Sequence, residues 1–94
     1  MLVTIICLDK PGHMDLRMKT RPAHLKWIEE QGLDALFVGP ILSDDGAAMM
    51  GSLFVAEFAD LAAARALQKT DPYQIAGLFE RVIIQPTRNV AKPK

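Results

Sequence analysis

The sequence has little cysteine, no excess of charge of either sign and no long apolar run, and each of these absences excludes a class of protein. Cys7 is its single cysteine, so no internal disulfide can form, and a lone thiol in an apolar run is typical of a reducing compartment. Eleven basic and eleven acidic residues cancel, which leaves no excess positive charge to attract nucleic acid or an anionic membrane. The longest apolar runs, such as residues 2–8, are too short to cross a bilayer, and no basic segment precedes one at the N-terminus as in a signal peptide. We therefore expect a cytoplasmic protein that binds neither nucleic acid nor membrane.

Several sequence motifs that carry chemistry are also missing. The sequence has no glycine-rich phosphate loop, no cysteine pair, no H-E-x-x-H segment and no G-x-S-x-G segment. His13 and His24 stand too far in sequence from other metal-ligating residues to suggest a metal site. We therefore expect neither a metal nor an organic cofactor, so any reaction would depend on the side chains of the chain itself.

Half of the residues are hydrophobic, which is enough for one folded domain with a modest core. No repeat, low-complexity stretch or linker divides the chain. We expect a single domain over residues 1–86, followed by a polar C-terminal tail over residues 87–94.

Strand and helix signals alternate along this domain. The expected strands cover residues 2–8, 36–42, 51–58 and 79–85, and the expected helices run from about residue 15 or 20 to 31, from 61 to 69 and, as a short turn, from 71 to 76. Gly32 is the expected C-terminal cap of the first helix, and Asp60 is the expected N-cap of the second. Pro22 is expected in the first turns of its helix, where a missing N–H costs little, and Leu25 and Ile28 are expected to form its buried face.

The second and third strands are predicted to form an antiparallel hairpin, because the segment Ser-Asp-Asp-Gly at residues 43–46 is a strong turn signal. Gly39 and Pro40 are expected to interrupt the second strand. The full order, strand, helix, strand, strand, helix, strand, is that of an α+β fold of the ferredoxin-like βαββαβ type, with a four-stranded antiparallel sheet and two main helices on one face.

The other face of that sheet would be left uncovered, yet the strands are apolar on both sides. In the third strand Phe54 and Ala56 point to one face, and Leu53 and Val55 point to the other. An uncovered apolar sheet face is a candidate interaction surface. The simplest partner is a second copy of the chain, so we expect a homodimer in which sheet packs on sheet.

His24 is the first candidate for chemistry. If it lies in the first turns of its helix, the positive end of the helix dipole disfavours the imidazolium. A neutral imidazole near pH 7 is what a general base needs. The alternative is a histidine at the edge of the core that makes one backbone hydrogen bond.

Asp71 is the second candidate, and Pro72 follows it. Aspartate before proline at a helix start is the expected N-cap pair, and capping alone would account for it. A capping carboxylate is also ionised and fixed in direction, which suits it to orient a histidine.

A third feature combines residues from two facing strands and one helix. Gly39-Pro40 and Gly51-Ser52 could leave room beside the sheet for a small ligand, with Ser52 as a polar contact, or could mark a bulge in the hairpin. Arg21, one turn before His24, could pair with an anionic ligand, or could belong to a solvated helix face.

Taken in order, these residues resemble one known family. The string Arg-Pro-Ala-His-Leu at residues 21–25, then Gly39-Pro40, then Gly-Ser-Leu at residues 51–53, then Asp-Pro-Tyr at residues 71–73, is similar to the YCII-related (YciI-like) domain family over nearly the whole chain. The resemblance implies a ferredoxin-like fold in the dimeric α+β-barrel superfamily and a His–Asp pair that falls on His24 and Asp71. Relatives in that superfamily include small monooxygenases, isomerases and dehalogenating enzymes. Residues 10–19 carry no family motif.

Three functions remain open from the sequence. The first is a cofactor-independent enzyme in which His24, oriented by Asp71, transfers protons for an isomerisation or elimination, with an unknown small molecule bound near Arg21, Gly39, Pro40, Ser52 and Tyr73. The second is a module that binds a small molecule without turnover, and the third is a structural dimeric domain. A histidine nitrogen about 2.6–3.2 Å from an Asp71 oxygen at the wall of an open cavity would keep the first two.

Overall fold

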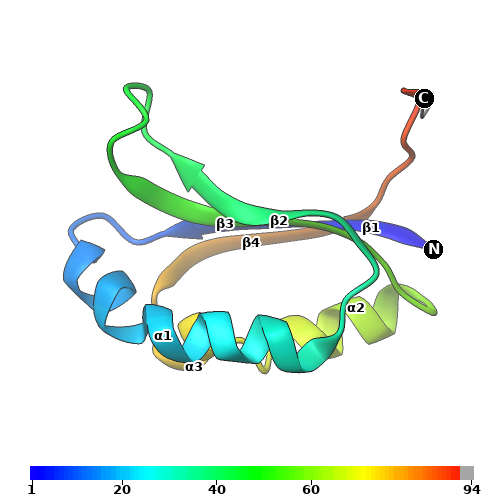
Figure 1. The fold of residues 1–94 in the computed structure, drawn as a ribbon, viewed down its shortest axis with the longest axis horizontal. Coiled ribbons are helices and arrows are strands. Elements are labelled where there is room, and N and C mark those ends of the chain that lie inside the picture. The colour runs from blue at the N-terminus through cyan, green and yellow to red at the C-terminus, as the bar shows by residue number, and fades with distance from the viewer. Residues whose placement is uncertain (92–94) are drawn as a thin grey trace.

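The computed structural model describes residues 1–91, and it contains four strands and three helices in the expected order (Figure 1). They are β1 (Leu2–Asp9), α1 (Met14–Gln31), β2 (Ala35–Leu42), β3 (Met49–Glu57), α2 (Leu61–Gln68), α3 (Pro72–Ile75) and β4 (Phe79–Pro86). The sheet order is β2-β3-β1-β4, with every neighbouring pair antiparallel. The predicted ferredoxin-like α+β fold is therefore confirmed.

All three helices lie on one face of the sheet, and no helix of the described residues covers the other face (Figure 1). In β1, the buried residues Val3, Ile5 and Cys7 alternate with partly exposed ones, as expected for a strand with one face on the core. In β3, Phe54 and Ala56 are buried on the same side. No helix among residues 1–91 is long and apolar enough to cross a membrane.

The hairpin of β2 and β3 forms as predicted, but the expected interruption of β2 is wrong. The strand continues through Gly39 and Pro40, which pair with Leu53 and Ser52. Because β2 is an edge strand, a proline in it can leave its missing N–H on the unpaired side without removing a bond from the ladder.

Helix α1 begins earlier than its proline suggested. Its predicted C-cap is confirmed, with Gly32 in the left-handed region at φ 58°. The placement of Pro22 in the first turns is wrong, because α1 starts at Met14 and Pro22 lies in its interior. The additional N-terminal turns bring Arg17 into the core, and these tertiary contacts offset the poor helix propensity of proline.

The expected buried face of α1 is also partly wrong. Leu25 is 47% exposed, and Ile28 is only partly buried. The residues that α1 buries are Arg17, His24 and Trp27. Apolar periodicity does not reveal such a face, since two of its three members are polar.

Helices α2 and α3 begin at the capping residues that the sequence predicted. The Asp60 carboxylate accepts from the Ala63 N–H at 2.8 Å, and the Asp71 carboxylate accepts from the Tyr73 N–H at 3.0 Å. The predicted tail follows β4 and is described as far as Ala91; its last three residues, 92–94, lie outside the described residues.

Candidate active site

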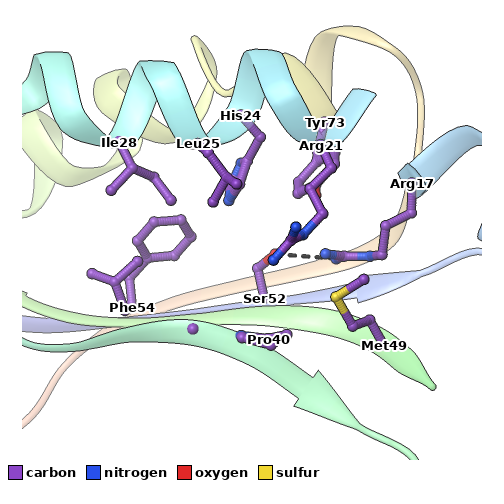
Figure 2. Close-up of a pocket in the computed structure, with 12 residues that line it drawn as sticks. Arg17, Arg21, His24, Leu25, Ile28, Pro40, Met49, Ser52, Phe54 and Tyr73 are labelled. Carbon is purple, nitrogen blue, oxygen red and sulfur yellow. Dashed lines mark hydrogen bonds between the residues drawn. The ribbon is translucent and has the colours of Figure 1, made fainter. Parts of the chain in front are cut away.

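A cavity of about 140 Å³ lies between α1 and the sheet (Figure 2). Helix α1 forms one wall, β2 and β3 form the opposite wall, and Tyr73 of α3 lies at one side. The five residues predicted to bind a ligand, Arg21, Gly39, Pro40, Ser52 and Tyr73, all line this cavity, and His24 does too.

Asp71 lies behind His24 and holds it. The Nδ1 atom of His24 is 2.8 Å from Oδ1 of Asp71, and both side chains are buried. A carboxylate can only accept here, so Nδ1 is the donor in this hydrogen bond. Within residues 1–91, Nε2 makes no hydrogen bond and is not fully buried. The second ring nitrogen is therefore available to a ligand in the cavity.

The expected position of His24 in the first turns of its helix, on which the helix-dipole argument depends, is wrong. His24 lies in the middle of α1, and the field of a helix terminus falls off within one turn. Packing fixes the ring instead. It stacks on Tyr73 with 4.0 Å between ring centroids, and its centroid is 5.9 Å from that of Trp27.

The same Asp71 oxygen that accepts from His24 also caps α3. Capping and orienting are compatible roles, as expected from the sequence, and one atom performs both. Trp27 of α1 donates to the Thr70 hydroxyl at 3.0 Å, which ties the histidine's helix to the segment that carries Asp71.

The two glycines do not create the cavity. A Cβ atom on Gly51 would collide with the backbone oxygen of Cys7, and one on Gly39 would meet the ring of Phe37. Neither Phe37 nor Cys7 lines the cavity. Gly51 permits the close approach of β3 to β1, and the prediction that these glycines leave room for a ligand is wrong.

Arg17 is the charged lining residue that was not predicted from the sequence. Its side chain is 2% exposed, and it donates through Nε and Nη2 to the two Asp9 carboxylate oxygens at 2.6 and 2.9 Å. Nη2 also lies 3.1 Å from the Ser52 hydroxyl oxygen, and the guanidinium carbon lies 4.4 Å from the centre of the Tyr73 ring. Arg17 lies seven residues before His24 and therefore on the same helix face, which is the signal that could have identified it.

Arg17 and Arg21 both bring positive charge to the cavity wall. Burial lowers the pKa of Arg17, but the hydrogen bonds and charge of Asp9 outweigh it and raise that pKa overall, so the guanidinium stays charged. Asp9 neutralises it. Arg21 is exposed at the cavity and forms no ion pair within the described chain. Arg21 thus presents a positive charge to a ligand, while the Asp71 carboxylate, which does not line the cavity, lies behind His24.

Two further titratable groups near the pair stay protonated at neutral pH. Burial, with a smaller contribution from the Asp71 charge, raises the pKa of the Cys7 thiol to about 12. Burial also raises the pKa of Tyr73. Because the thiolate is the reactive form of cysteine, Cys7 is not poised as a nucleophile. Among residues 1–91, no group of three or more His, Cys, Asp or Glu side chains could hold a metal ion.

Comparison with known proteins gives consistent matches over nearly the whole chain. A family model described as the YCII-related domain matches residues 1–88. The chain is 38% identical over 98 residues to Protein YciI of Escherichia coli, covering 96% of this chain and 99% of that protein. It is 30% identical over 97 residues to an uncharacterized protein of Haemophilus influenzae, with the same coverage of both chains.

Two solved structures share its fold. The 5-chloro-2-hydroxyhydroquinone dehydrochlorinase of Burkholderia phenoliruptrix, in complex with 2,5-dihydroxybenzoquinone, superimposes with a TM-score of 0.85 at 28% identity over 94% of each chain. An antibiotic biosynthesis monooxygenase superimposes with a TM-score of 0.55 at 15% identity, over 95% of this chain and all of that one. At this lower identity, the second match shows the fold alone.

Proposed function

This chain belongs to the YCII-related domain family, and we propose that it is a small-molecule enzyme that transfers protons to and from one six-membered ring. The observation that carries the proposal is the 2.8 Å contact between His24 Nδ1 and Asp71 Oδ1 at the wall of an open cavity. In this proposal His24 is the general base and acid, and Asp71 orients it.

The size of the cavity limits the substrate. An apolar protein cavity of about 150 Å³ accepts one benzene molecule, and the cavity here is about 140 Å³. Apolar side chains, including Ile28, Val38 and Phe54, supply much of its wall. One ring with a few small substituents fits this space.

The charge of the cavity indicates which ring. Arg21 favours a ligand that is anionic or becomes anionic, and Nε2 of His24 needs an acidic proton to accept. A hydroxylated ring meets both requirements. One similar structure is a dehydrochlorinase named for a chlorinated hydroxyhydroquinone, and we propose the same class of substrate for this chain.

Elimination from such a ring needs proton transfer alone. One hydroxyl proton moves to the ring carbon that bears the chlorine, and one carbonyl forms. A second hydroxyl then loses its proton to His24, its electron pair becomes the second carbonyl, and chloride leaves. Overall the ring loses HCl and becomes a hydroxyquinone, and no external oxidant is consumed.

We place this activity in the cytoplasm, which cell fractionation can test.

The direct test is to incubate the protein with 5-chloro-2-hydroxyhydroquinone and to measure chloride release under anaerobic conditions, which suppress oxidation of the ring by air. We expect release to rise in proportion to protein concentration, with the hydroxyquinone formed in equal amount. If the compound binds in calorimetry but is recovered unchanged after long incubation, the chain is a binding module and the enzymatic proposal is wrong.

We also propose a homodimer that buries the helix-free face of the sheet. In the single chain, apolar side chains of β2 stay exposed to solvent: Leu36 is 60% exposed and Phe37 is 48% exposed. Large exposed apolar patches mark interaction sites. We expect the chain to sediment as a dimer at micromolar concentration and Phe37→Asp to sediment as a monomer. A monomeric wild-type chain would contradict this assembly.

A further inference from the structure

We propose that the buried Asp9–Arg17 ion pair aims the Ser52 hydroxyl into the cavity, where it binds an oxygen on the sheet side of a conjugated ring. The inference rests on the proposed function in one respect, that the same cavity holds the ring. It adds two positioning residues and a requirement on the substrate: an acidic hydroxyl facing His24 and a second oxygen across the ring, facing Ser52.

The hydrogen-bond inventory of Ser52 leads to this inference. A serine hydroxyl has one proton to donate and two lone pairs to accept with, whereas a guanidinium can only donate. Arg17 Nη2 lies 3.1 Å from the Ser52 oxygen, so Ser52 is the acceptor in that bond. Its own proton has no acceptor within residues 1–91, although the residue is only 3% exposed. A buried donor without an acceptor is costly, and Ser52 lines the cavity, so a bound ligand can supply the acceptor.

Arg17 and the packing of Gly51 fix the orientation of Ser52. Arg17 reaches both Asp9 oxygens through two parallel bonds, a bidentate geometry that fixes the plane of the guanidinium. The guanidinium also lies over the Tyr73 ring at 4.4 Å. On the strand, Gly51 precedes Ser52 and packs against β1 too closely to accept a side chain. The direction of the hydroxyl is therefore set before a ligand arrives.

His24 and Ser52 face the ligand from opposite walls. Figure 2 shows His24 descending from α1 and Ser52 rising from the sheet. When His24 removes a proton from a hydroxyl on one side of a conjugated ring, negative charge moves through the ring to an oxygen on the other side. A donor already aimed at that oxygen, backed by the Arg17 charge, stabilises the anion more than the neutral ring.

The probe for this inference is 4-nitrophenol, a single ring whose anion absorbs visible light and whose negative charge spreads to the nitro oxygens across the ring. We expect wild-type protein to bind the anion more tightly than the phenol, which lowers the pKa of the bound probe. Ser52→Ala is expected to weaken binding of the anion about tenfold and to raise the pKa of the bound probe by about one unit. Absorbance titration of the bound probe against pH measures both quantities.

Three controls separate a donor role from a structural one. Ser52→Thr keeps a hydroxyl and is expected to restore the pKa of the bound probe. Ser43→Ala, at the chain's other serine, is expected to leave it unchanged. Arg17→Lys cannot form the two parallel bonds, so it should shift the pKa as Ser52→Ala does and should add nothing in the Ser52→Ala background.

The outcomes distinguish this inference from the proposed function. If Ser52→Ala binds the anion with wild-type affinity and an unchanged pKa of the bound probe, or if the wild type binds no nitrophenol, the inference is overturned. If the predicted shifts appear while the wild type releases no chloride from the chlorinated ring, the inference stands and the proposed elimination fails. If the wild type releases chloride and Ser52→Ala does so equally fast, the elimination stands and the role of Ser52 fails.

Discussion

Replacing His24 with glutamine is expected to lower the rate of chloride release by about 10²–10⁴-fold, the usual contribution of one positioned general base. Glutamine has a volume close to that of histidine and can still hydrogen-bond to Asp71, but it has no nitrogen that accepts a proton near pH 7. Binding of the ring should change much less than turnover, because apolar walls and Arg21 remain. Chloride release and calorimetric binding, measured on the same preparation, test this split.

The chain supplies its own control for this variant. His13 is its only other histidine; it precedes α1 and hydrogen-bonds to the backbone oxygen of Pro11 at 2.8 Å. It does not line the cavity, so His13→Gln should release chloride at the wild-type rate. Equal rates in the His24 and His13 variants would show that His24 is not the base.

Asp71→Asn then separates the two roles of Asp71. Asparagine is as good an N-cap as aspartate, so α3 and the free energy of unfolding should be preserved. The carboxylate that holds the proton on Nδ1 is lost, however, and an amide that rotates to donate to Nδ1 would place the ring proton on Nε2. We expect a loss of turnover of about 10²-fold or more, as for other histidines held in the wrong tautomer. A stable Asp71→Asn protein with full activity would reduce Asp71 to a cap.

The fold was predictable because its signals are local. The turn at residues 43–46 and the caps Gly32, Asp60 and Asp71 each specify a boundary that tertiary contacts did not move, and the strands lie within two residues of their expected bounds. The start of α1 was not decided by local signals, which offered residues 15 and 20, and the helix starts at Met14, next to the earlier of the two. Its first turns are stabilised by the contacts of Arg17 rather than by their own sequence pattern, and Pro22 suggested a later start.

The candidate site was predictable in part, and partly for the wrong reason. His24 and Asp71 do meet, but the ring is oriented by a hydrogen bond and by stacking on Tyr73, not by a helix terminus. Asp9 ends β1, and Arg17 follows the turn, in a segment without a family motif, so nothing in the sequence paired them. A buried ion pair depends on three-dimensional packing. In the composition, its two members look the same as ordinary surface charges.

The largest effect on stability is expected from that ion pair. Arg17→Met keeps the length of the side chain but leaves the Asp9 carboxylate, whose side chain is 9% exposed, without its partner. Removing one member of a buried pair costs about 3–5 kcal/mol, so we expect the free energy of unfolding in urea to fall by that amount. Arg21→Met, one turn along the same helix at an exposed position, is the matched control, and it should change stability by less than about 0.5 kcal/mol.

A second substitution shows what the pair is for. In Arg17→Met, the added change Asp9→Asn removes the uncompensated charge, and buried pairs replaced by neutral residues are often no less stable than the original. We expect the double variant to recover most of the lost free energy of unfolding. It should not recover the lowered pKa of bound 4-nitrophenol, because no cation then stands behind Ser52. Recovery of both the free energy of unfolding and the lowered pKa of the probe would mean that the pair only fills the core. Recovery of the free energy of unfolding alone would mean that the chain keeps two buried charges in order to aim the Ser52 hydroxyl at its ligand.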